Sequence, residues 1–156
     1  MLRQTLKGVT MLTLIVGLAL VTAAVTAKAQ STNVVSDIPF KFIVGDKTLP
    51  SGNYLVSSAT SGGDVLRISS RKENASTMRL TNSVQGKAGN TKPRLIFHRY
   101  GEQYFLAEVW TGESTGRQLR KSSQERALQR ELTKIAAKSE SGTRSYELVE
   151  VVAIAR

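Results

Sequence analysis

A single histidine carries the most versatile chemistry in this chain, and its surroundings indicate a packed side chain. His98 lies between Phe97 and Arg99 in a run of apolar and aromatic residues. A lone histidine can serve as a base or as a metal ligand. The chain has no cysteine and no second histidine, so a zinc site would depend on carboxylates alone. We therefore expect His98 to be a packed or rim residue, and we predict no catalytic residue, metal or other cofactor.

Three carboxylates on predicted strands are examples of candidates for hydrolytic chemistry. A glycosidase needs two carboxylates across a cleft, and Glu108 with Glu147 or Glu150 would supply such a pair. The alternative is structural, because Glu108 is predicted to share a strand face with Arg99 and to form an ion pair there. The sequence contains no Gly-x-Ser-x-Gly elbow, no Gly-x-Gly-x-x-Gly motif and no phosphate-binding loop.

Four basic residues gather around the predicted start of a helix. They are Arg117, Arg120, Lys121 and Arg126. Arginine matches phosphate and carboxylate groups with paired donors, and a helix N-terminus adds partial positive charge. The four residues are our candidate anion-binding site, and the alternative is a solvated face that maintains solubility. The aromatic residues follow a strand pattern instead of forming base-stacking platforms, so no nucleic acid partner is expected.

The N-terminus predicts export. Arg3 and Lys7 precede an uncharged run over residues 8–27, and Ala27-Lys28-Ala29 forms an A-x-A cleavage signal. We expect a signal peptide over residues 1–29 with cleavage between Ala29 and Gln30, and a single β-rich domain over residues 30–156. The alternative is an uncleaved membrane anchor. Cleavage removes three basic residues and lowers the formal net charge from +10 to +7, with no transmembrane segment left in the mature chain.

A β-hairpin organises the centre of the chain. Gly101-Glu102 separates two apolar and aromatic runs, and glycine at the first turn position predicts a type II′ turn with positive φ. The turn sets the register. It pairs Tyr100 with Gln103, Arg99 with Tyr104, His98 with Phe105, Phe97 with Leu106, Ile96 with Ala107 and Leu95 with Glu108. Both faces of the hairpin are largely apolar, so both are expected to be covered.

One helix is predicted, over residues 123–138. Ser122-Ser-Gln-Glu125 is a capping box, in which the Ser122 hydroxyl accepts from the amide of Glu125 while the Glu125 carboxylate reaches back. Leu128, Leu132, Ile135 and Ala136 form one narrow apolar stripe. Such a stripe requires a partner, and the apolar faces of the hairpin provide one.

The remaining pattern predicts strands separated by turns. Besides the hairpin, we expect strands over residues 33–45, 54–58, 65–70, 75–81 and 146–154, with a polar connection over 82–92 and a turn-rich link over 111–120. The predicted fold is all-β, a mainly antiparallel sandwich or open barrel of about seven strands, with one amphipathic helix near the C-terminus.

Two segments resemble an uncharacterised family of small exported β-rich proteins of Acidobacteria-type soil bacteria. The first reads Ile38-Pro-Phe-Lys-Phe-Ile-Val-Gly45 and then Leu49-Pro-Ser-Gly-Asn-Tyr54, which is similar to the family pattern I-P-F-x-F-x-V-G…L-P-x-G-x-Y. The second comprises Leu95 to Gly101, Tyr104-Phe-Leu, Trp110, Gly116-Arg-Gln-Leu119 and Lys121-Ser122. The resemblance covers residues 34–132 and departs at Ser51 and Arg120, where alanine and proline are expected. It implies an exported β-rich domain and transfers no catalytic residue.

Two functions therefore remain open. The absence of a catalytic motif favours a non-catalytic exported binding or structural module of the cell envelope, periplasmic or extracellular. The basic cluster adds the hypothesis that this module associates with an anionic envelope polymer or surface. The alternative is a small hydrolase acting on an envelope polymer or polysaccharide. The ligand and the oligomeric state do not follow from the sequence.

Overall fold

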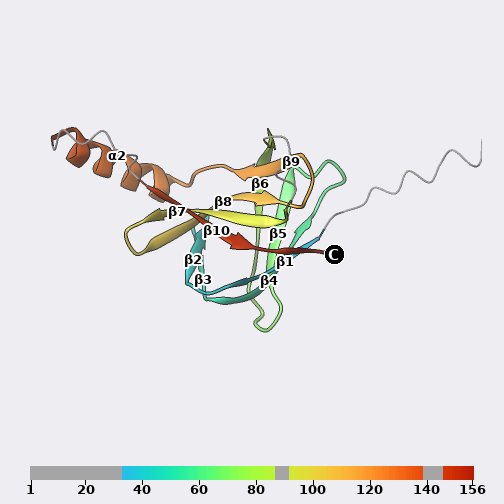
Figure 1. Cartoon of the computed structure of the whole chain (residues 1–156). Helices are drawn as coiled ribbons and strands as arrows, with labels where there is room; N and C mark the ends of the chain where they lie inside the picture. Colours follow the sequence, from blue (N-terminus) through green and yellow to red (C-terminus); the bar gives the residue numbers. More distant parts are fainter. Residues whose placement is uncertain (1–32, 87–91, 139–145) are drawn as a thin grey trace, which may run out of the picture. The chain divides into compact units, whose positions relative to one another are not determined.

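A computed structural model describes residues 33–86, 92–138 and 146–156, and within these ranges the protein consists mainly of strands (Figure 1). It has eleven strands and one helix near the C-terminus in the described residues, which confirms the predicted all-β fold with one helix. The strand number exceeds the expected seven because predicted strands are divided and others were missed. The predicted signal peptide and its cleavage site at Ala29 and Gln30 lie outside the described residues.

Two antiparallel sheets share one long strand. The first has the order β11-β1-β4-β5-β6 and the second the order β6-β9-β8-β7-β10. The strands of the first sheet are β1 (Val34–Ile38), β4 (Gly52–Ser58), β5 (Val65–Ser70), β6 (Ser76–Gln85) and β11 (Ile154–Ala155). Those of the second are β7 (Arg94–Tyr100), β8 (Gln103–Trp110), β9 (Thr115–Leu119) and β10 (Glu147–Val152). Two short strands, β2 (Phe42–Val44) and β3 (Lys47–Leu49), pair with each other, and β2 runs parallel to β8 at Ile43.

The C-terminal segment supplies the edge strand of each sheet. Its first part, β10, pairs with β7, and its second part, β11, pairs with β1. Between them Ala153 is buried, and the Ser36 hydroxyl donates to the carbonyl of Val152 at 2.9 Å. No ladder joins β1 to β10 in the described residues, so the arrangement is an open sheet instead of a closed barrel.

Pro39 explains why the first predicted strand is divided. Proline cannot donate a ladder hydrogen bond, and the chain leaves β1 after Ile38 and re-enters as β2 at Phe42. The prediction of one continuous strand over residues 33–45 was therefore wrong. The two parts belong to opposite sheets, and they contribute Val34, Ile38, Phe42 and Val44 to the same core.

Two strand segments, the second half of β6 and the whole of β9, were missed because they are polar. The expected polar connection begins inside β6, whose residues from Thr81 to Gln85 pair with β9, and β9 occupies the expected turn-rich link. The two missed segments are therefore partners in one ladder. Their short polar sequences carry no alternation that would indicate a strand, and only the neighbouring strands of the sheet define them.

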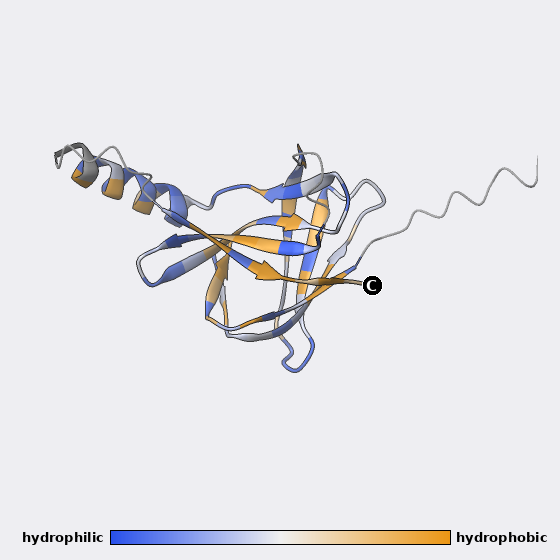
Figure 2. Cartoon of the chain, in the orientation of Figure 1, coloured by the Kyte–Doolittle hydropathy of each residue, from blue (hydrophilic) through white to orange (hydrophobic). Residues whose placement is uncertain are grey.

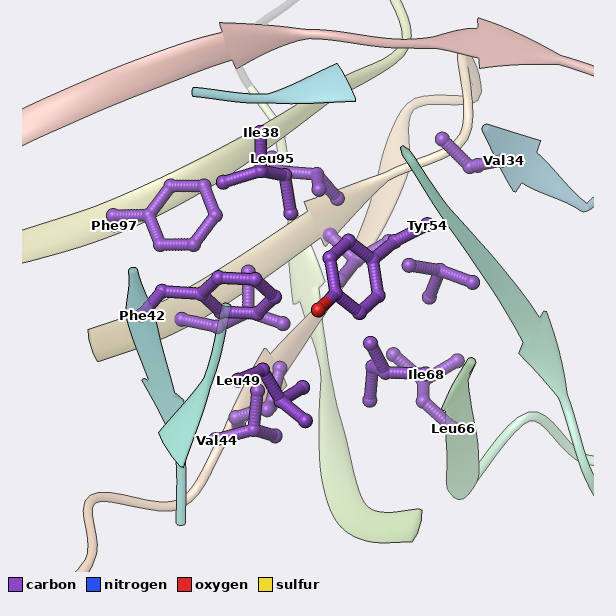
Figure 3. Close-up of a cluster of buried hydrophobic side chains, with 14 of the residues drawn as sticks. Val34, Ile38, Phe42, Val44, Leu49, Tyr54, Leu66, Ile68, Leu95 and Phe97 are labelled. Carbon is purple, nitrogen blue, oxygen red and sulfur yellow. The ribbon is translucent and has the colours of Figure 1, made fainter. Parts of the chain in front are cut away.

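The core lies between the two sheets. Its largest fully buried side chains come from both sheets and from β2 and β3 (Figure 3). They include Tyr54, Phe42, Phe97, Ile38, Leu49, Ile68 and Leu95. Phe42 meets Tyr54 and Phe97 edge to face, at centroid distances of 5.0 and 5.6 Å. Edge-to-face contacts fix the relative orientation of these rings in addition to removing apolar surface from water.

The central hairpin forms with one irregularity. Gly101 has φ of +59°, and the four pairs nearest the turn, from Tyr100 with Gln103 to Phe97 with Leu106, have the predicted register. Beyond them a bulge at Ala107 shifts the ladder by one residue, so that Ile96 faces Glu108 and Leu95 faces Val109. The predicted pairs of Ile96 with Ala107 and of Leu95 with Glu108 were wrong. The shift turns Val109 toward the core with Leu95.

The helix α2 (Ser123–Lys138) has the predicted bounds and packs beside the second sheet. Figure 2 shows its apolar residues along one side. Leu128 and Leu132 contact a small cluster formed by Ile43, Tyr100 and Phe105, whereas Ile135 is 57% exposed. The first two turns of the stripe therefore dock the helix on the second face of the hairpin.

Candidate functional site

Three of the four predicted anion-binding residues line one pocket. Arg120, Lys121 and Arg126 surround a cavity of about 280 Å³ on the outer face of the second sheet. Arg120 and Lys121 belong to the link after β9, and Arg126 belongs to the first turn of α2. The cations are thus brought together by the way the chain turns from β9 into the helix.

Arg117 does not belong to this pocket. Its guanidinium donates to the carbonyl of Gly62 at 2.7 Å and lies 3.7 Å from the carboxylate of Asp64. The reason is strand alternation, because Arg117 and Gln118 project from opposite faces of β9 and Gln118 is the one that lines the pocket. The structure therefore separates Arg117 from the other three candidates and gives it a loop-anchoring role.

The pocket floor is polar. Asn82 on β6 and Gln118 on β9 both line it, and they are direct partners in the ladder. Directly opposed residues point to the same face of a sheet. Two exposed amides therefore lie side by side in the pocket lining, where each can donate to or accept from a ligand.

A buried pair of titratable side chains forms one wall. Nδ1 of His98 lies 2.7 Å from Oε1 of Glu125, and both side chains are more than 90% buried. The Tyr100 hydroxyl donates to the same oxygen at 3.3 Å. Burial raises the pKa of Tyr100, and the nearby Glu125 carboxylate raises it further. The hydroxyl consequently keeps its proton at neutral pH and remains a donor.

The helix start holds Glu125 in place. The amide of Glu125 donates to the Ser122 hydroxyl at 3.0 Å, as the capping box predicts. The carboxylate, however, does not reach back along the helix but accepts from His98 and Tyr100. Because α2 docks against the sheet through Leu128 and Leu132, its first turn is brought over β7, and the carboxylate finds stronger partners there.

Lys121 is also held from two sides. Its ammonium donates to Oε1 of Gln129 at 2.8 Å and lies 5.0 Å from the centroid of the Tyr146 ring. The ring of Tyr146 in turn packs against His98 at a centroid distance of 4.2 Å. These contacts restrain Lys121 and His98 before any ligand arrives, which lowers the ordering cost of binding.

The three candidate carboxylates are engaged outside the pocket lining, although Glu108 lies on the same sheet face as the pocket, directly opposite Gln118. Glu108 accepts from the indole N–H of Trp110 at 2.9 Å, Glu147 pairs with Arg99 at 3.3 Å, and Glu150 lies 3.7 Å from Arg94. None of the three lines the pocket. The predicted ion pair between Arg99 and Glu108 was wrong, because the bulge at Ala107 moves Glu108 opposite Ile96. Arg99 pairs instead with Glu147, its direct neighbour on β10.

A second cavity differs in charge. It has a volume of about 300 Å³, and Lys41 and Glu102 are the charged residues that line it. Their charges cancel, so this cavity offers no excess charge to an ion. Of these two cavities, only the first is lined mainly by basic charges.

Comparison of the chain with family models, with curated proteins and with solved structures gives no match. Within the described ranges, no helix has the length and apolar character needed to cross a membrane. The same residues contain no group of three or more His, Asp or Glu side chains that could hold a metal ion. The function of the pocket must therefore be inferred from its residues and their geometry.

Sequence reasoning missed the contact between His98 and Glu125 and the pair of amides. His98 was expected to be packed, and it is buried. One signal was available for its partner, since a histidine on an apolar strand face needs a polar group and the predicted helix was expected to cover that face. For Asn82 and Gln118 no signal existed, because neither strand segment was predicted.

Proposed function

We propose that this protein is a non-catalytic exported binding module that attaches to an anionic polymer or surface of the cell envelope through the pocket described above. The observation that carries the proposal is the convergence of Arg120, Lys121 and Arg126 on one cavity with a floor of two amides. Glu125 is the one carboxylate in its lining, and its Oε1 is already engaged by His98 and Tyr100.

Charge and geometry both favour an anionic ligand. Arginine presents paired N–H donors to phosphate or carboxylate, and Lys121 adds a compact charge. The predicted mature chain has a net charge of +7, which attracts polyanions over a distance of about 8 Å at physiological salt. Part of the positive charge is concentrated at the pocket.

A small hydrolase is the second candidate, and the contact between His98 and Glu125 favours it. A carboxylate that accepts from Nδ1 orients a histidine as a general base. The pocket lining, however, contains no serine, threonine, tyrosine or cysteine that could serve as a nucleophile. A hydrolase would therefore have to activate water, and activity assays on peptidoglycan and acidic polysaccharides would reveal turnover that depends on His98.

Binding is tested with purified protein, vesicles containing phosphatidylglycerol, and alginate. The test variant is Arg120→Ala/Lys121→Ala/Arg126→Ala. The control is Arg67→Ala/Arg71→Ala/Lys72→Ala, which removes the same charge from exposed residues outside the pocket. We expect wild-type binding at low salt that weakens steeply as salt rises. The pocket variant should lose at least about tenfold in affinity and the control much less.

Two outcomes would overturn the proposal. If the wild-type protein bound neither probe at low salt, the pocket would not be an anion site of this kind. If the two triple variants lost equal affinity, net charge alone would explain the binding. Export is tested separately by the intact mass of the protein recovered outside the cytoplasm, where a chain beginning at Gln30 is expected and a retained N-terminal segment would contradict it.

A further inference from the structure

The charge balance of the pocket selects among anions. Among the lining residues, Arg120, Lys121 and Arg126 contribute three positive charges and Glu125 one negative charge, which leaves an excess of at least two positive charges. A carboxylate or a phosphodiester carries one negative charge and would neutralise at most half of this excess. A phosphomonoester carries between about −1.5 and −2 at neutral pH and neutralises more of it.

The second ring nitrogen of His98 is available to a ligand. Nδ1 is engaged by Glu125, and Nε2 has no hydrogen-bond partner among the described residues. His98 lines the pocket, so a ligand there reaches the ring. Tyr146 packs on this ring at 4.2 Å and Tyr100 meets its edge at 6.5 Å, which restrains its rotation. To donate to the ligand through Nε2 while Nδ1 donates to Glu125, His98 must carry a proton on each nitrogen, which adds one positive charge to the pocket.

The size of the cavity suits a single charged group with a small attachment. Its volume is about 280 Å³, close to the lower bound of about 300 Å³ for ligand sites. A phosphate with one attached sugar or glycerol is of this size, and an end group or side group of a polymer can enter the pocket while the rest of the polymer lies outside. Asn82 and Gln118 on the floor supply the donors and acceptors that hydroxyl groups beside the phosphate require.

We propose that the pocket binds a phosphomonoester end group or side group, and that His98 donates to it through Nε2 while Glu125 holds Nδ1. This inference rests on the proposed function and specifies its ligand. The phosphate is contacted by Arg120, Lys121 and Arg126, and the attached hydroxyl-bearing group lies over the two amides. Two sources share this chemistry, a phosphorylated sugar and a lipid whose head group is a phosphomonoester.

The single histidine of the chain makes direct contact measurable. Nitrogen NMR of the imidazole in ¹⁵N-labelled wild-type protein is followed during titration with inorganic phosphate and glucose 6-phosphate. We expect a saturable change at Nε2, with a smaller change at Nδ1. Acetate and dimethyl phosphate, each with one negative charge, should bind at least about tenfold more weakly. An Nε2 signal that does not respond at saturating phosphomonoester would overturn the proposal.

Two substitutions separate the two roles of His98. In His98→Asn the amide nitrogen takes approximately the place of Nδ1, which retains the contact with Glu125 and removes the donor to the ligand. In His98→Gln the amide nitrogen takes approximately the place of Nε2 and the contact with Glu125 is lost. We expect His98→Asn to bind glucose 6-phosphate about tenfold more weakly, because a hydrogen bond to a charged group is removed. Binding by His98→Asn at wild-type strength would contradict direct contact.

The sources are distinguished by vesicles. Phosphatidic acid presents a phosphomonoester on a membrane, whereas phosphatidylglycerol presents a diester. If the protein binds phosphatidic acid vesicles as tightly as it binds glucose 6-phosphate, the phosphomonoester group itself is the ligand, whatever carries it. If the protein binds glucose 6-phosphate but not phosphatidic acid vesicles, the ligand is a phosphorylated sugar. If alginate and phosphatidylglycerol bind through the three cations but phosphomonoesters gain nothing and Nε2 is unchanged, this inference fails while the proposed function survives.

Discussion

Nδ1 of His98 and Oε1 of Glu125 lie 2.7 Å apart although 27 positions separate the two residues in the chain. The contact joins β7 to the first turn of α2 and forms a wall of the basic pocket. It couples the docking of the helix to the shape of the candidate site, since Arg126 follows Glu125 on the same turn. Disruption of this contact is therefore expected to affect both.

Replacement of Glu125 by alanine should destabilise the protein. The change leaves His98 and Tyr100 buried without their shared acceptor, and an unsatisfied buried donor costs about 1–3 kcal/mol. Urea unfolding followed by circular dichroism measures the loss. Glu131→Ala is the control, because Glu131 is exposed on the same helix and should change stability by less than about 0.5 kcal/mol. Equal losses in the two variants would show that the contact contributes no net stability.

Truncation of a leucine and of an isoleucine on α2 should lower the free energy of unfolding by different amounts. Leu128 is partly buried against Tyr100 and Phe105, so Leu128→Ala should cost about 1–2 kcal/mol, less than a fully buried leucine. Ile135 is 57% exposed, and Ile135→Ala should cost under about 1 kcal/mol. Chemical denaturation of both variants gives the comparison. A larger loss for Ile135→Ala would mean that the second half of the helix carries the docking.

Gly116→Ala should disturb the single tryptophan. A Cβ at Gly116 would lie 2.7 Å from the Trp110 ring, which covers this glycine. The ring would have to shift, and such overpacking costs about 1–3 kcal/mol. The emission of Trp110, which is 5% exposed, should move to longer wavelength as the ring is displaced toward water. Gly62→Ala is the control, because its nearest neighbour is the rotatable carboxylate of Asp64, and it should leave the emission unchanged.

Alkaline pH should reveal the buried Tyr100 hydroxyl. Burial and Glu125 raise its pKa above the ordinary value of 10.0, so the folded state retains this proton where the unfolded state loses it. The stabilisation is full below pH 10 and is lost as the pH rises from there toward the folded pKa. Tyr100→Phe should therefore lose stability with pH less steeply than the wild type above pH 10, in urea unfolding between pH 8 and 11.

Tyr54 provides a comparison in the same experiment. Burial and Glu73 raise its pKa as well, so the wild-type slope contains a contribution from this second tyrosine. The difference between the wild type and Tyr100→Phe isolates the part that belongs to Tyr100. Parallel stability curves for the two proteins above pH 10 would contradict the assignment.

The features that follow from the sequence depend on residues close together in the chain. The bounds of α2, the bond between the Ser122 hydroxyl and the Glu125 amide, and the positive φ of Gly101 agree with their local motifs. The four hairpin pairs nearest Gly101 also agree, because a tight turn leaves the adjacent residues one register. Binary patterning likewise indicates the fold class, since alternating apolar residues specify strands whatever their order in a sheet.

The features that only the tertiary structure decides depend on partners far away in the chain. The bulge at Ala107 turns Val109 into the core between two sheets, and no local pattern indicates which residue will be left unpaired. Arg117 and Gln118 are neighbours in sequence, but the pairing of β9 with β6 and β8 sends them to opposite faces. Glu125 turns from its own helix to His98 because docking of α2 supplies buried donors that a free helix lacks. Local interactions therefore select the elements, whereas the register and packing of distant segments decide which side chains share the pocket.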